Sequence, residues 1–466
     1  MTATLRALPV WVRRTFHVSN EQDQLRRYAA GPRKSVVRTS DSPGIGRRTF
    51  LHGAATQGLV AAAAAIAPIA AAVQHAEAQV AAPGVARAPV VLREFRDPYI
   101  ELIRLLREAS EVEHALMLQY LYGAFSLKPT YAALRGTGAP NSNDLLGIAV
   151  QEMQHLGAVN RLLVALGAAP NLMPQDFPYE PDIYPFAFNL EPLSRHSLAK
   201  YIYAEAPAGA MSDLRPPELR VEIETALGRG VRTNQVGSLY DAVLAAMGQL
   251  EAENRRQRLP REVDFGYWRT QLTRIRSEGE LEHYRFFRSV FSGTHTAFGL
   301  RLNAWALPVT HPNYPALAVP TNPSALAGHP NQIAEPRALQ MAWLGNLHYW
   351  TVLGLLTQGY KTETPAFIHL AEAHMQGPIA SIAMALAARG AGMPFEQLSI
   401  GYSPALDDQQ AIYFFTRLLR EMQAVESDLK GDLPADYPRG VAAASLEELT
   451  GLWAATQKLR DFRLRG

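Results

Sequence analysis

The chain has 466 residues, of which 48 % are hydrophobic and 19 % are charged, and its formal net charge is +2. This composition is typical of a globular protein and excludes an intrinsically disordered chain. The sequence contains no cysteine, which excludes disulfides, thiolate metal sites and cysteine nucleophiles.

The N-terminal residues 1–78 have the parts of a twin-arginine export signal. A basic, polar N-terminal extension precedes Arg47 and Arg48, an apolar, alanine-rich run follows from 58 to 73, and an A-x-A pattern ends at Ala78. The apolar run is short for a bilayer span, and an uncleaved membrane anchor is the alternative. We therefore expect a protein that uses the twin-arginine export machinery and is periplasmic or secreted.

The positive charge is concentrated in this N-terminal segment. Residues 1–78 contain ten Lys and Arg against four Asp and Glu, which leaves 35 Lys and Arg against 39 Asp and Glu in the remainder. The expected mature protein is therefore slightly acidic, and its sequence does not indicate a nucleic-acid partner.

The 3.6-residue period of apolar side chains predicts a series of helices within residues 95–295. Four of them are expected to form a bundle, at about 98–126, 143–167, 194–205 and 264–291. Two shorter helices, at about 217–228 and 236–256, are expected to fill a crossover between bundle helices. One long crossover between paired helices is the ferritin-like form of a four-helix bundle.

A proline-rich segment, 296–335, has no periodic pattern and is predicted to be a linker at a domain boundary. A second helical region is expected at 336–466, with helices near 336–359, 366–389, 407–431 and 445–463. No part of the chain has a convincing strand pattern, so the predicted fold is all-α. This region contains His348, His369 and His374. We expect them to pack or to contact a partner, with haem ligation as the alternative.

The pairing of Glu with His suggests a metal site. A di-metal site in a helical bundle usually takes one Glu from each of two helices and a Glu-x-x-His pair from each of the other two. Residues three apart share a helix face, so both members of a pair can reach the same ions. Random placement in this composition predicts fewer than one such pair, whereas the sequence contains three: Glu111–His114, Glu152–His155 and Glu280–His283.

In the first helix, Glu113 lies on the apolar stripe, where a carboxylate is costly to bury unless something binds it. Glu111 shares its face with charged residues and is expected to face solvent. We therefore predict Glu113 as the ligand from this helix, with Glu111 and His114 as the alternative. Glu205 occupies the equivalent position on the apolar face of the third helix.

The predicted ligands occur in the order Glu, Glu-x-x-His, Glu, Glu-x-x-His, on four separate helices. They are Glu113, Glu152, His155, Glu205, Glu280 and His283. These donors suit two iron ions, with manganese or another transition metal as the alternative. Glu278 and Glu282 flank the last pair and exchange roles with Glu280 if the helix register differs.

Four tyrosines lie close to the predicted ligands in the sequence: Tyr120, Tyr122, Tyr201 and Tyr203. A buried tyrosine usually fills the core and hydrogen-bonds through its hydroxyl group, and this is the role that we expect. Lining a substrate cavity or carrying a radical is the alternative.

With these residues in view, the chain resembles the ferritin-like domain family of the iminophenyl-pyruvate dimer synthase type, whose members act in the biosynthesis of violacein and related bis-indoles. The similar segments are Glu113-His114, Gln119 to Tyr122, Gln151 to Leu156, Phe177-Pro178, Tyr203 to Pro207, Val236 to Tyr240, Glu278 to Glu280 and His283-Tyr284. The resemblance covers about 95–295 and implies a ferritin-like fold with a metal site.

These observations favour an exported oxidase or oxygenase that activates dioxygen or peroxide at a di-iron centre and acts on a small-molecule substrate. Oxidative coupling of the iminophenyl-pyruvate dimer synthase type is the alternative reaction. A non-catalytic iron-binding or stress protein is the alternative from another class. An oligomer is compatible with each of these functions.

Overall fold

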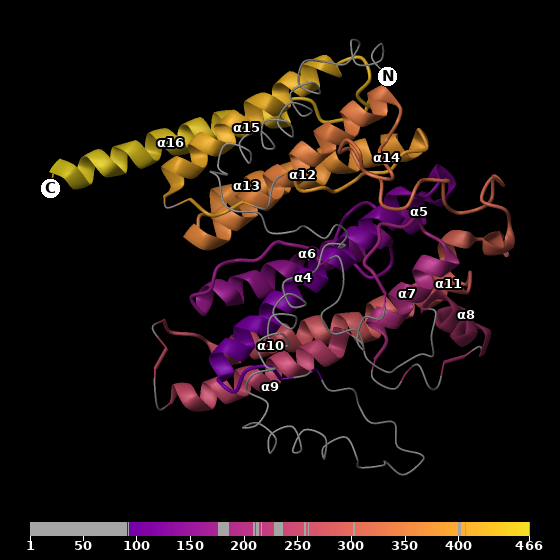
Figure 1. Ribbon diagram of the computed structural model, residues 1–466, viewed down its shortest axis with the longest axis horizontal. Coiled ribbons are helices and arrows are strands. Elements are labelled where there is room, and N and C mark those ends of the chain that lie inside the picture. Colours follow the sequence, from indigo (N-terminus) through magenta and orange to yellow (C-terminus); the bar gives the residue numbers. More distant parts are fainter. Residues whose placement is uncertain are drawn as a thin grey trace, which may run out of the picture. The chain divides into compact units, whose positions relative to one another are not determined.

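The computed structural model describes 91, 93–175, 186–207, 210, 214–215, 217–227, 236–255, 258–259, 261–301, 303–398, 402–405 and 407–465. The expected export signal, 1–78, lies outside the described residues. The described residues form helices and connections without a β-strand, which confirms the predicted all-α fold (Figure 1).

The first two bundle helices are α4 (Pro98–Phe125) and α6 (Leu145–Ala165), which pack along each other. Helix α4 begins where the Asp97 side chain accepts hydrogen bonds from the backbone N–H groups of Tyr99 and Ile100, the usual way to satisfy free donors at a helix N-terminus. The Tyr99 hydroxyl donates to the Leu166 carbonyl (2.8 Å). This bond joins the start of α4 to the end of α6, so the two helices are antiparallel.

The third bundle position is filled by two successive helices, α7 (Arg195–Glu205) and α9 (Val236–Asn254). Helix α7 packs on α11, whereas α9 packs on α4 and on α10. Helix α8 (Pro217–Leu227) lies between them in the sequence and packs on α7. The expectation that 236–256 fills a crossover is therefore wrong, because α9 belongs to the bundle itself.

The fourth bundle position is a continuous helical stretch with a change of winding in its middle. Helix α10 (Phe265–Ser277) continues into a π-helical turn, η3 (Glu278–His283), and then into α11 (Tyr284–Phe291). The Arg195 guanidinium lies over the Phe291 ring at 4.2 Å, and Arg269 pairs with Glu251. This stretch is therefore antiparallel to α7 and α9. Leu193, just before α7, donates its backbone N–H to the Ser126 hydroxyl just after α4, and Tyr201 contacts the Gln119 carbonyl. Helix α7 is thus antiparallel to α4, and the long connection 166–194 joins the parallel helices α6 and α7.

The C-terminal helices are α12 (Pro336–Thr362), α13 (Pro365–His374), the π-helical η6 (Met375–Ile379), α14 (Ala380–Ala388), α15 (Asp408–Asp428) and α16 (Val441–Arg465). Short helical turns lie elsewhere, at η2 (Pro129–Tyr131), α5 (Ala132–Arg135), η4 (Thr296–Phe298) and η5 (Ala304–Ala306). Ala88–Gly466 form one compact unit, within which α12 contacts α6 and α14 contacts α4. The segment predicted as a linker thus lies inside this unit.

None of the helices in the described ranges combines the length and the apolar character that a membrane crossing requires.

Candidate metal centre

Five ionisable side chains meet inside the four-helix bundle. Glu113 projects from α4, Glu152 and His155 from α6, Glu205 from the last residue of α7, and His283 from the last residue of η3. Each is at most 4 % exposed. Buried charges are costly unless they are paired or bind a cation, so this cluster needs a physical reason.

The Glu152 carboxylate is the centre of the cluster. Its Oε2 lies 2.9 Å from Nδ1 of His155, and its Oε1 lies 2.9 Å from Nδ1 of His283. The two imidazole rings stack with their centroids 6.0 Å apart. Both histidines thus direct Nδ1 to the same carboxylate, one to each of its oxygens.

Two groups of ligand atoms share Glu152. One group joins it to Glu113 and His155, the other to Glu205 and His283, and the atoms of each group lie within 4.8 Å of one another. Glu113 Oε2 is 3.6 Å from His155 Nδ1, and Glu205 Oε1 is 3.6 Å from His283 Nδ1. The arrangement is two neighbouring sites that share Glu152.

A tyrosine hydroxyl group orients each of the outer carboxylates. Tyr240, on α9, donates to Oε1 of Glu113. Tyr120, on α4, donates to Oε1 of Glu205 at 2.6 Å. Both hydroxyl groups come from elements that do not carry the carboxylate they orient, so the contacts depend on the assembled bundle.

The outward nitrogen of each histidine also has a partner. Nε2 of His155 donates to Oε2 of Glu278 at 2.7 Å, and Nε2 of His283 donates to Oε1 of Gln151 at 3.2 Å. Such outer partners fix the ring orientation of metal-binding histidines in general. Here they keep both Nδ1 atoms directed at Glu152.

The cluster holds protons in the metal-free protein. Burial acts to raise the pKa of Glu152, but the charges of His283 and His155 hold it well below its usual range. Burial, assisted by Glu152, raises the pKa of Glu113 to about 8. Burial opposes protonation of the histidines, yet Glu152 raises the pKa of His283 to about 10 and that of His155 well above its ordinary value. A metal ion that binds here must therefore displace protons.

The residues fit a pair of metal ions. Nδ1 of His283 is buried close to carboxylate oxygens, but among the described residues it has no aligned hydrogen-bond partner. A cavity of about 10 Å³ lies against Glu113, Glu152 and Glu205, which is about the space of one water molecule. Gly279 is needed beside it, because a Cβ there would lie 2.7 Å from Oε2 of Glu205.

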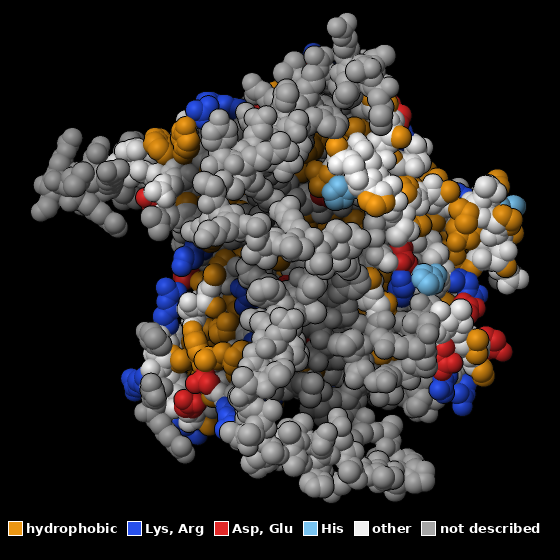
Figure 2. All heavy atoms as spheres, viewed as in Figure 1, with side chains coloured by type: hydrophobic (Ala, Val, Ile, Leu, Met, Phe, Trp, Pro, Cys, Tyr) orange, Lys and Arg blue, Asp and Glu red, His pale blue; other side chains and the backbone are white. Residues whose placement is uncertain are grey.

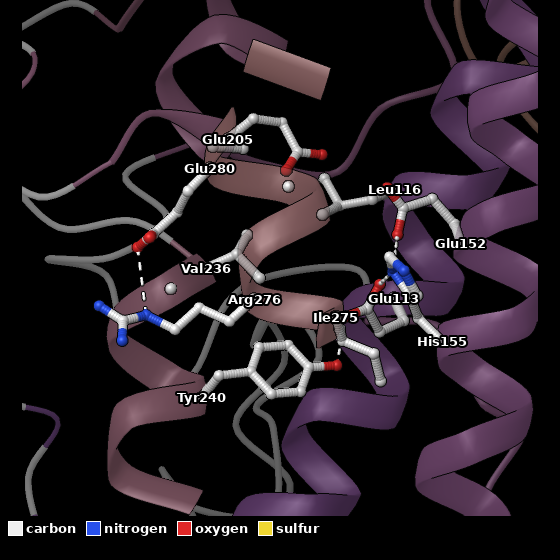
Figure 3. A pocket seen from close by; sticks show the side chains of 13 residues that line it. Glu113, Leu116, Glu152, His155, Glu205, Val236, Tyr240, Ile275, Arg276 and Glu280 are labelled. Atoms are coloured by element: carbon white, nitrogen blue, oxygen red, sulfur yellow. Dashed lines mark hydrogen bonds and ion pairs between the residues drawn. The ribbon is translucent and has the colours of Figure 1, made fainter. Parts of the chain in front are cut away.

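Glu280 lies apart from the other five predicted ligands. Its Oε1 is 3.4 Å from Nε of Arg276, and Arg276 also pairs with Asp241 at 2.9 Å. Figure 3 shows Glu280 turned toward Arg276, whereas Glu113, Glu152 and His155 converge. In a π-helix the backbone bonds join residues five apart, so Glu278, rather than Glu280, shares the inner face of η3 with His283.

The alternatives from the first helix have other partners. Glu111 is half-buried and accepts hydrogen bonds from Asn171 (2.8 Å) and Gln175 (3.3 Å), so the expectation that it faces solvent is wrong. Nε2 of His114 shares a hydrogen bond of 2.8 Å with the Tyr349 hydroxyl on α12. Both residues therefore lie away from Glu152. Glu282, an alternative to Glu280 in η3, is exposed and accepts a hydrogen bond from Ser142.

The four predicted tyrosines have different environments. Tyr120 donates a hydrogen bond to the Glu205 carboxylate. Tyr122 donates to the Pro320 carbonyl, and Tyr201 donates to the Gln119 carbonyl at 3.0 Å. Tyr203 is buried beside the Phe186 ring. Tyr240 and Gln151 also contact the cluster but lie outside the predicted site residues, because their contacts arise only when α9 and η3 are in place.

A four-helix bundle with one long crossover, and with carboxylates and histidines gathered inside, is the arrangement of ferritin-like proteins. Residues 106–291 match the protein-family model described as Ferritin-like. This segment begins in α4 and ends with α11, so it contains all five members of the cluster. The match confirms the predicted resemblance to ferritin-like proteins.

The chain is also similar to dichlorochromopyrrolate synthase of Lentzea aerocolonigenes. The two are 29 % identical over 229 residues, which cover 44 % of this chain and 20 % of the relative. The chain thus matches only a fifth of the length of that protein. No solved structure matches the chain.

Proposed function

We propose that the chain is an exported oxidase or oxygenase that binds two iron ions in its ferritin-like bundle. The observation that carries this proposal is the position of Glu152 between two buried histidines, with Glu113 beside one and Glu205 beside the other. A purely structural cluster of this kind would bury charges without a compensating ligand.

The proposed ligands divide into two positions that share the Glu152 carboxylate. Glu113 and His155 complete one position, and Glu205 and His283 complete the other. Three carboxylates balance most of the charge of two divalent cations, and the mixed oxygen and imidazole donors suit iron. When bound, a pair of iron ions supplies the electrons for reduction of dioxygen or peroxide, coupled to oxidation of a substrate.

The surrounding side chains position the ligands and limit the access of water. Tyr120 and Tyr240 hold the outer carboxylates through their hydroxyl groups. Leu116, Val236 and Ile275 line the same cavity, so its walls are partly apolar. Such a wall restricts water around a reactive site.

Oxidative coupling of the iminophenyl-pyruvate dimer synthase type is the second candidate reaction. Its support is the similarity to dichlorochromopyrrolate synthase, which covers 44 % of this chain. The match covers 20 % of that protein. The proposal therefore concerns only the type of reaction, oxidative coupling.

The proposal of export is based on the twin arginines, Arg47 and Arg48, and the residues around them. They predict that the protein is periplasmic or secreted. The proposed partners are the export machinery and a small-molecule substrate with dioxygen or peroxide. Nucleic acid is not among them. On the face in Figure 2, both blue basic and red acidic side chains of the described residues occur.

The direct test loads metal-free protein with Fe²⁺ under anaerobic conditions and then adds dioxygen with a reductant. The proposal predicts about two iron ions per chain and repeated consumption of oxygen. One round of oxidation followed by retained ferric iron would instead support the non-catalytic iron-binding protein. A chain that takes up no iron would contradict both functions.

A further inference from the structure

The two proposed metal positions are matched in their carboxylates. Each outer carboxylate accepts one hydrogen bond from a tyrosine hydroxyl, Glu113 from Tyr240 and Glu205 from Tyr120. Both positions also share Glu152. The hydrogen bonds to the outer carboxylates therefore do not distinguish the two positions.

The outer partners of the histidines differ. His155 donates from Nε2 to a carboxylate oxygen of Glu278 at 2.7 Å. His283 donates from Nε2 to an amide oxygen of Gln151 at 3.2 Å. That amide oxygen also lies 3.1 Å from the Ser142 hydroxyl, whose single hydrogen is directed at the Glu282 carboxylate.

A carboxylate behind a metal-binding imidazole makes the imidazole a stronger donor than a neutral amide does, because the anion stabilises the positive charge that metal binding places on the ring. The contact between His155 and Glu278 is also shorter, and charge-assisted hydrogen bonds are stronger than neutral ones. His155 is therefore the better donor of the two histidines.

We propose that Glu278 is a positioning residue that makes the two metal positions unequal. The position of Glu113, Glu152 and His155 binds the first ion, and the position of Glu205 and His283 binds the second. This inference rests on the proposed function, since it requires that the cluster bind two ions. It assigns Glu278 a role outside the ligand set.

The π-helical turn η3 explains why Glu278 has this place. Glu278 and His283 are the first and last residues of η3, and residues five apart share a face of a π-helix. Arg274 lies 3.4 Å from the second carboxylate oxygen of Glu278, so it pairs with Glu278 from the side of solvent. Glu280 is in the same turn but contacts Arg276 instead, which makes it a matched control.

The test measures stepwise metal binding rather than turnover. Metal-free protein is titrated calorimetrically with Mn²⁺, and a parallel titration with Co²⁺ follows the visible absorption of each bound ion. The wild-type chain is expected to bind the ions in two separate steps. Glu278→Gln should weaken the first step by about 10- to 100-fold, the range for loss of an outer partner of a metal ligand, and should leave the second step unchanged. Glu280→Gln should change neither step.

Combining Glu278→Gln with His283→Ala or with His155→Ala shows which metal position Glu278 affects. In His283→Ala, one ion should remain, and Glu278→Gln should weaken it. In His155→Ala, the remaining ion should be insensitive to Glu278→Gln. Conversely, Gln151→Glu should tighten the second step, because it places a carboxylate behind His283.

Several outcomes would overturn the inference. They are a single affinity for both ions in the wild-type chain, equal weakening of both steps by Glu278→Gln, or no effect in the His283→Ala background. Stepwise binding of two ions without oxygen consumption would contradict the proposed enzyme function while leaving the inequality intact. A wild-type chain that binds neither Mn²⁺ nor Co²⁺ overturns the inference and removes its basis.

Discussion

Tyr120 donates a hydrogen bond of 2.6 Å to Oε1 of Glu205, and this bond joins the first bundle helix to the end of α7 inside the cluster. We expect Tyr120→Phe to lower the free energy of unfolding of the metal-free protein by about 1.5–3 kcal/mol, the range for a hydrogen bond to a charged group. It should also weaken metal binding at the position of Glu205. Urea unfolding and metal titration measure the two effects.

Tyr201→Phe is the control for this prediction. Its hydroxyl donates to the Gln119 carbonyl at 3.0 Å rather than to a carboxylate of the cluster. The substitution should change stability without changing metal affinity. Equal losses of metal affinity in both variants would mean that Tyr120 acts only through packing.

The stability of the metal-free protein should fall as the pH rises above neutral. Glu113 has a pKa of about 8 and His283 of about 10, above their ordinary values of 4.5 and 6.5. A raised folded-state pKa stabilises the fold below the unfolded value, and this contribution is lost as the pH rises through the folded value. Glu113 thus loses its contribution between about pH 4.5 and 8, and His283 between about pH 6.5 and 10.

Urea unfolding of the metal-free protein across this range checks the prediction. His283→Ala should flatten the upper part of the curve, because it removes the group that titrates there. A free energy of unfolding that stays constant or rises from about pH 6.5 to 10 would contradict the assigned protonation states.

Glu113 and Glu111 should respond differently to the same substitution. Glu113→Gln removes a charge that balances the cations, so it should weaken metal binding while the metal-free bundle stays folded or becomes more stable. Glu111→Gln should cost about 1 kcal/mol in stability, because an amide accepts less well from Asn171 and Gln175, and its metal content should not change. Loss of metal in Glu111→Gln alone would place the site on the other face of α4.

Arg47→Lys combined with Arg48→Lys should keep the protein in the cytoplasm. The paired arginines are the part of the expected signal that the export machinery reads. Cell fractionation of the wild-type and variant chains measures the effect. Normal export of the double variant would show that another signal directs this chain.

Much of the fold could be predicted from apolar periodicity and capping residues. The expected first helix, 98–126, is close to the observed Pro98–Phe125, which begins after the capping residue Asp97. The stretch 366–389 was expected as one helix, but a π-helical turn at Met375–Ile379, which contains Pro378, divides it. Local patterns predict such helices well, because the signals lie within the helix itself.

The placement of α9 and the direction of Glu280 could not be predicted in the same way. The apolar face of α9 indicates burial, but only its contacts show that it continues the line of α7. The prediction of Glu280 assumed α-helical spacing to His283, and the π-helical turn directs it to Arg276 instead. Both differences arise from tertiary packing and from a winding change without a clear sequence signal.

The most direct test of the account is the metal content of the purified chain and of two variants. Elemental analysis should find about two metal ions per wild-type chain, and about one fewer in His155→Ala and in His283→Ala, because each variant removes the imidazole of one position. Circular dichroism should show that both variants keep their helices. Metal content that is the same in all three proteins would contradict the claim that Glu152 and its two histidines form a di-metal site.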